Sequence, residues 1–151
     1  MAAQKYLRHE ARGTRHEEML SEEAFVMIGD HVGYAIRACA RKGVRDVVIA
    51  GQFAKLLKIA CGNEQTHVSS SELDLHSLAS WLCLDPRFSH LAPLAKRANT
   101  AREVLEASGT DPCLIALVCG KVREFAERMA PEVEVKVLLA GYTMEALYFG
   151  K

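Results

Sequence analysis

The sequence predicts an α/β fold, a small Rossmann-like layer with a mainly parallel sheet flanked by helices. Two short apolar runs, residues 24–28 and 46–50, each end at a glycine and are followed by apolar residues at helical spacing. A third run, residues 132–140, also ends at a glycine. Carboxyl ends of parallel strands meet at one rim, so we expect Gly29, Gly51 and Gly141 to lie together where α/β sheets bind ligands.

The first elements follow from this pattern. We expect residues 24–28 to form a buried strand, Asp30 to cap a helix over 31–42, and Gly43 to end that helix. Residues 46–50 form the second strand. The order of strand, helix and strand predicts a parallel, right-handed crossover between the two runs.

Capping signals divide the middle of the chain. A helix over 53–61 ends at Gly62, and Ser69-x-x-Glu72 is a capping box for a helix over about 70–83. A further helix runs over about 91–107 and restarts at Thr100, where Thr100-x-x-Glu103 forms a second box. Gly109 ends it.

The last third of the chain begins with a strong start signal, Asp111-Pro112, for a helix reaching about residue 129. Residues 132–140 alternate between polar and apolar before becoming fully apolar, which favours a strand at the edge of the sheet. Tyr148 and Phe149 predict one more short strand.

Composition predicts one domain with a substantial core, because the chain has 151 residues and half are hydrophobic. We expect residues 1–22 to be a charged lead-in or linker remnant and residues 23–151 to be a single α/β domain. Lys and Arg total 19, as do Asp and Glu, which argues against a nucleic-acid partner. With no apolar leader and no apolar run near the ~20 residues of a membrane span, we expect a cytoplasmic protein without membrane contact.

The five cysteines predict buried free thiols in a reducing compartment. Their number is odd, no C-x-x-C pair occurs, and most have apolar neighbours. Because no zinc-ligand spacing is present, we expect no metal site.

Two lysines are the first candidates for a binding role. Lys55 and Lys58 are spaced i, i+3, so they share a helix face directly after the strand that ends at Gly51. Their ammonium groups, with the backbone N–H groups of the helix start, suit a polyanionic ligand. The alternative is an ordinary solvated helix face.

Two loops supply further candidates. Thr66-His67 offers a hydroxyl and an imidazole for acid–base chemistry or ligand binding, or His67 is simply exposed. Gly29-Asp30-His31-x-Gly33 lacks a dinucleotide fingerprint, so Gly33 is expected to allow close helix–strand packing and Asp30 to cap a helix. No Ser-His-Asp or Cys-His arrangement has usable spacing, and catalytic residues stay unassigned.

These segments resemble the CbiD family, the cobalt-precorrin-5B C1-methyltransferases of cobalamin biosynthesis. Residues 28–35 resemble its "G(N/D)xxG" stretch, and residues 47–62 resemble its "GHxGKLxKxAxG" block. Thr66-His67 resembles its "TH" step, and residues 99–105 resemble its downstream helix.

The resemblance implies methyl transfer from S-adenosylmethionine to C1 of a cobalt-corrin precursor that carries many carboxylates. The protein would mainly hold donor and acceptor in line. The implied ligand-binding candidates are Gly29, Asp30, Gly33, Gly51, Gln52, Lys55, Lys58, Thr66 and His67.

The sequence also departs from the family. The family's His is Gln52 here, its Gly is Ala54, and no Arg follows His67 closely. The family's N-terminal half has no counterpart, so we expect either a C-terminal fragment or a stand-alone relative, with that half or a second copy as partner. The alternatives are a non-catalytic ligand-binding or interaction module and a purely structural domain.

Overall fold

The fold is α/β in the residues that the structure, a computed structural model, describes: 21–67, 75–143 and 145–150. These residues form six α-helices, two short 3-10 helices and a three-stranded mixed sheet. In chain order they are η1 (Glu22–Ala24), α2 (Val32–Arg41), β1 (Asp46–Gly51), α3 (Phe53–Ala60), α4 (Leu75–Leu84), η2 (Ser89–Leu91), α5 (Ala92–Arg97), α6 (Ala101–Ala107), α7 (Pro112–Met129), β2 (Glu134–Ala140) and β3 (Ala146–Gly150).

The sheet has the order β1-β2-β3. β1 and β2 pair in parallel from Asp46 opposite Glu134 to Gly51 opposite Leu139, and β3 runs antiparallel to β2. The predicted edge position of residues 132–140 is therefore wrong, because β2 is the central strand. Its polar alternation reflects a partly exposed face at the start of the strand, where Glu134 is exposed and Lys136 half-buried, and not a missing neighbour.

The predicted first strand is also wrong. Residues 25–28 follow η1 without joining the described sheet, and Val26 and Met27 are 75% and 90% exposed. An apolar run marks a strand only if another strand pairs with it, and β1 pairs with β2. The predicted crossover from residues 24–28 to 46–50 is thus absent, and the parallel pair is joined instead through α3 to α7.

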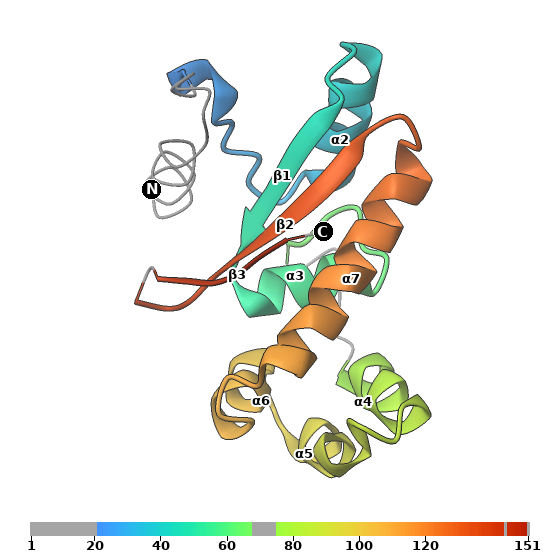
Figure 1. Cartoon of the computed structure of the whole chain (residues 1–151), viewed down its shortest axis with the longest axis vertical. Coiled ribbons are helices and arrows are strands. Elements are labelled where there is room, and N and C mark those ends of the chain that lie inside the picture. The colour runs from blue at the N-terminus through green and yellow to red at the C-terminus, as the bar shows by residue number, and fades with distance from the viewer. Residues whose placement is uncertain (1–20, 68–74, 144, 151) are drawn as a thin grey trace.

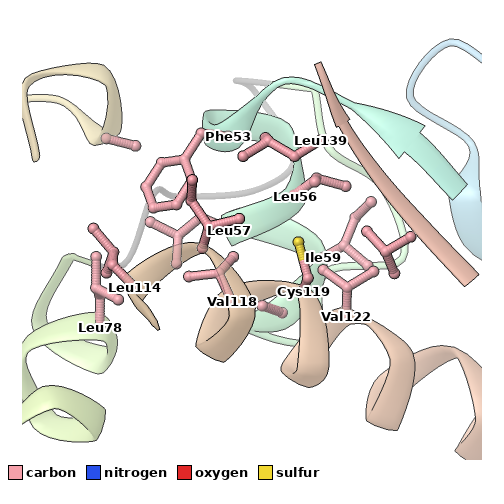
Figure 2. Packing of buried hydrophobic residues seen from close by; sticks show 14 of the residues in the cluster. Phe53, Leu56, Leu57, Ile59, Leu78, Leu114, Val118, Cys119, Val122 and Leu139 are labelled. Atoms are coloured by element: carbon pink, nitrogen blue, oxygen red, sulfur yellow. The ribbon is translucent and has the colours of Figure 1, made fainter. Parts of the chain in front are cut away.

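The core is one continuous cluster that joins the sheet to all six described α-helices. α3 packs along α7, and α7 packs on β2. Figure 2 shows Leu56 and Leu57 of α3 among Val118 and Cys119 of α7, with Leu139 of β2 close by. Figure 1 shows α4, α5 and α6 grouped at the end of the molecule away from the sheet.

The middle helices confirm the predicted restart at Thr100. The chain leaves the helical conformation at Ala98 and re-enters it after Thr100, so residues 92–107 form two helices. The Thr100 hydroxyl accepts from the Glu103 N–H at 3.1 Å, and the Glu103 carboxylate accepts from the Asn99 N–H at 2.9 Å. The other predicted capping box, Ser69 with Glu72, lies outside the described residues.

The cysteines are less buried than predicted. Cys119 is buried, and desolvation raises the pKa of its thiol to about 12. Cys83 and Cys113 are exposed, because they lie on the outer faces of α4 and α7 despite their apolar neighbours in sequence. None of the described helices is long and apolar enough to span a membrane.

Candidate functional site

The candidate site lies where β1 passes into α3. β1 ends at Gly51, the extended residue Gln52 is the N-cap, and α3 starts at Phe53 beside the end of β1 (Figure 1). Gln52 is exposed and its side chain makes no capping hydrogen bond. Because β1 and β2 run in parallel, Gly51 and Gly141 lie at the same end of the sheet, where the carboxyl ends of the two strands meet, as expected. We refer to this end as the edge of the sheet below. Gly29 is not a strand end but a turn residue with φ of +54°, before α2.

Asp30 joins three segments at this edge. The Lys55 Nζ donates to the Gly29 carbonyl at 2.7 Å and lies 3.0 Å from Asp30 Oδ1. The Thr66 hydroxyl donates to the same Asp30 oxygen at 2.9 Å, and the Thr66 N–H donates to the Asp30 carbonyl at 3.0 Å. We call Asp30, Lys55 and Thr66 the Asp30 clasp. It ties the turn before α2 and the loop before residue 68 to α3.

Lys58 adds a second tie to the same loop. Its Nζ donates to the Thr66 carbonyl at 3.0 Å, and the Asn63 side-chain amide donates to the Lys58 carbonyl at 3.0 Å. Thr66 itself is only 4% exposed. The two lysines share a helix face as predicted, but each is half-buried and bonded to the protein, so they do not form an ordinary solvated face.

Gly33 allows the loop to approach α2. Its N–H donates to the Glu64 carbonyl at 3.0 Å, and a Cβ at this position would lie only 2.7 Å from the Glu64 Cβ. The Arg37 guanidinium pairs with the Glu64 carboxylate at 2.5 Å. The sequence predicted close packing at Gly33 against a strand, and the structure places the loop there instead.

The charges in the clasp set the state of Asp30. The hydrogen bond from Lys55 lowers the pKa of the Asp30 carboxyl, and the bond from Thr66 lowers it further. The charges of Lys55 and His67 contribute smaller effects in the same direction. Asp30 is therefore ionised at neutral pH and unsuited to donate a proton there. It is not the predicted helix cap either, since His31 is the N-cap of α2 and its side chain makes no capping bond.

Several candidate residues at this edge are exposed. His67 and Gln52 are exposed, and Gly51 is half-buried. Among the described residues, no cluster of three or more His, Cys, Asp or Glu could hold a metal ion. This arrangement offers two lysines, one paired with Asp30, beside the exposed side chains of His67 and Gln52 and a helix start that the Gln52 side chain does not cap.

Each residue of the Asp30 clasp was a candidate from the sequence, but the residues that hold the neighbouring loop in place were not. Asn63, Glu64 and Arg37 were not candidates, because their partners lie on other segments or on backbone carbonyls. The sequence signal for Asn63 was its place directly after Gly62, whose φ of +92° ends α3.

Comparison with curated proteins finds relatives that share one description, cobalt-precorrin-5B C(1)-methyltransferase. The relative from Geotalea daltonii is 67% identical over 133 residues, which cover 88% of this chain and 37% of the relative. The relative from Geobacter sulfurreducens is 65% identical over 139 residues, which cover 92% of this chain and 38% of the relative. A more distant relative from Priestia megaterium is 33% identical over 97 residues, 64% of this chain and 26% of the relative.

The chain thus spans less than two fifths of the length of the curated relatives that it matches. No family model matches the sequence, and no solved structure matches it.

Proposed function

The chain belongs to the CbiD family, and from this premise we propose that it supplies ligand-binding residues for methyl transfer from S-adenosylmethionine to C1 of cobalt-precorrin-5B. The relatives that carry this description are more than twice as long as the match. The proposal therefore gives these residues a share in binding and leaves the complete reaction to a longer polypeptide.

The observation that carries the proposal is the Asp30 clasp. It brings three segments, around residues 29, 55 and 66, to the edge of the sheet where α/β proteins bind ligands. Each of these segments also resembles a family motif. A rigid site of this kind orients a bound molecule without reorganising, which is the main protein contribution to a reaction between two bound substrates.

The chemistry of the edge suits the proposed substrate. A corrin precursor presents many carboxylates, and Lys55 and Lys58 place two positive charges beneath the loop that carries His67. Because both ammonium groups already bond to the protein, they contribute mainly through their charge. His67 and Gln52 are the exposed groups that would contact the ligand.

S-adenosylmethionine fits the same edge through its α-carboxylate. The start of α3 offers N–H groups that the Gln52 side chain does not cap. This sulfonium compound supplies the methyl group, while the residues here would hold and orient it.

A second candidate function is a non-catalytic binding or interaction module that kept the fold. Two departures favour it, since Gln52 and Ala54 replace the His and Gly of the family block. The internal bonding of Lys55 and Lys58 also limits how far either can reach toward a ligand. This module would bind a corrin but yield no methylated product when combined with the rest of a relative.

Calorimetric titration tests the binding proposal. The folded chain is titrated with S-adenosylmethionine, with a cobalt corrin bearing free carboxylates, and with the same corrin fully amidated. We expect binding of the carboxylate form and much weaker binding of the amidated form.

Two variants locate the contact. His67→Ala and Gln52→Ala should each weaken binding about two- to tenfold, the range for one lost hydrogen bond. His90→Ala, an exposed histidine on η2, is the matched control and should change nothing. Absence of heat with every ligand, from a chain that is well folded, contradicts the proposal.

A further inference from the structure

Residues 25–28 form an apolar segment that is attached to the domain at both ends. The Phe25 N–H donates to the Glu22 carbonyl at 3.0 Å, and the Ile28 carbonyl accepts from the His31 N–H at 3.1 Å. Phe25 is half-buried in an extended conformation, and the half-buried Ile28 packs on the core. The segment, drawn in blue ahead of α2 in Figure 1, is therefore held in place without belonging to any described strand.

The two central side chains of this segment are exposed. Val26 is 75% exposed and Met27 is 90% exposed. Successive side chains of an extended segment point to opposite sides, so a segment that lay flat on the domain would bury one of the two. With Tyr34 they make three of the five large hydrophobic side chains that are exposed in the described part of the chain, and all three lie within residues 26–34.

The backbone of Val26 and Met27 is open as well. Among the described residues, no hydrogen bond pairs the N–H or the C=O group of either residue. Unpaired backbone groups beside exposed apolar side chains form a template for another strand, and proteins normally cover such a segment. Addition of a strand does this, because the backbone groups bond to the added strand while side chains pack in its pockets.

We propose that residues 25–28 pair, as a β-strand, with an extended segment of the CbiD polypeptide that lies outside the matched region. About three fifths of the Geotalea daltonii relative has no counterpart in the match, so ample chain exists to supply this strand. The proposal concerns the assembly of the longer polypeptide and does not depend on the ligand proposed above. It also accounts for the strand-like sequence of a segment that has no neighbour in the described sheet.

The shortness of the segment favours this occupant over a second copy. Four residues at about 3.3 Å each extend over roughly 13 Å. A stable interface between separate chains buries about 800 Å² on each partner, which so short a segment does not supply. A strand from the same polypeptide needs less area, because its effective concentration near the segment is high.

Hydrogen exchange in a chimera tests the proposal without any ligand, so its result is independent of the proposed function. The matched region of the Geotalea daltonii relative is replaced by this chain, and exchange of the Val26 and Met27 amides is measured by mass spectrometry. We expect both amides to exchange at least about tenfold more slowly in the chimera than in the isolated chain. Hydroxyl-radical labelling of Met27 should fall in parallel, while Leu84, 82% exposed on α4, should be labelled equally in both.

Two matched substitutions give the second arm. Met27→Glu places a charge in the proposed contact and should lower the unfolding midpoint of the chimera by several degrees. The isolated chain should be nearly unchanged, because Met27 is 90% exposed in it. Leu84→Glu is the control and should affect neither form. A third arm adds the unmatched part of the relative in trans to the isolated chain, and protection of the Met27 amide should then rise to saturation.

Equal exchange of the Val26 and Met27 amides in all forms would overturn the proposal. So would protection that rises with the concentration of the isolated chain, together with a dimer in light scattering, because a second copy would then be the occupant. Protection in the isolated chain that is lost on removal of residues 1–20 would also overturn it, because the occupant would then be the N-terminal part of this chain.

Discussion

Asp30 shows how a single residue can be correctly singled out and wrongly interpreted. Its position after Gly29 and before an apolar helical stripe predicts an N-cap. The structure instead turns the carboxylate toward Lys55 and Thr66, where two donors share one oxygen. A charge-assisted bond to a lysine on another element outweighs a local cap, and no local pattern reveals it.

This assignment predicts a pH dependence of stability. The pKa of Asp30 lies below its ordinary value of 3.8, so its contribution to stability is present above about pH 4. That contribution is lost as the pH falls through the lowered folded-state pKa. Asp30→Asn should therefore be less stable than the wild type near pH 6, and the difference should close as the pH falls through the lowered pKa of Asp30.

Urea unfolding at several pH values measures that difference. Glu132→Gln removes an exposed carboxylate outside the clasp and serves as the control, which should follow the wild type at every pH. A constant difference between Asp30→Asn and wild type over the whole range would show that the charge of Asp30 has no part in it.

At Gly33 we predict the effect of adding a side chain. Gly33→Ala should destabilise the chain by about 1–3 kcal/mol, because the new Cβ meets Glu64 and forces the loop away from α2. Gly120→Ala on α7 is the matched control, since nothing lies within 4 Å of its Cβ. It should stabilise the helix by about 0.5–1 kcal/mol. Equal shifts of the urea midpoint in both variants would show that the close approach of Glu64 to Gly33 does not affect stability.

At the scale of elements, caps and glycines predicted the helices well. Asp111 accepts from the N–H groups of Cys113 and Leu114 and starts α7 at Pro112, as the sequence indicates. Gly43 and Gly109 adopt positive φ where helices were expected to end. These signals are local, because each cap is satisfied within a few residues.

The strands were harder to predict because pairing is not local. Residues 24–28 are as apolar as β1 but have no neighbour in the described sheet, while β2 carries charges and is central. Whether a run becomes a strand depends on which segments of the chain meet. In this chain, α3 and α7 follow β1 and precede β2 in sequence, and they pack against each other.

The capping box at Thr100 supports a prediction at this scale. Thr100→Ala removes the hydroxyl that accepts from the Glu103 N–H and should destabilise the chain by about 0.5–2 kcal/mol. Thr100→Ser keeps an acceptor and should lie close to the wild type. Thermal unfolding of the two variants measures this difference, and equal losses would show that packing of the Thr100 methyl matters and the cap does not.

For the whole molecule, the sequence predicted the α/β class but not the number of layers, and the place where chemistry would gather stays a prediction. Of the described helices, α3 and α7 contact the sheet and pack against each other, and Rossmann-like layering is not shown. The core of α3 and α7 was predictable from helical spacing.

At the scale of the whole molecule, the proposed binding site lies where β1 ends and α3 begins. Gly29 to Asp30, Gly51 to Lys55, and Thr66 to His67 come from three parts of the chain and meet through the Asp30 clasp. If the family chemistry uses these residues, a ligand must perturb all three segments together.

Amide chemical-shift mapping by NMR tests this most directly. The ¹⁵N-labelled chain is titrated with the carboxylate form of the cobalt corrin, and shifts are followed residue by residue. If the three segments bind one ligand, we expect saturable amide shifts in residues 29–30, 51–55 and 66–67, with a common dissociation constant. Saturable shifts confined to another region, such as α4 to α6, or none at all, would contradict it.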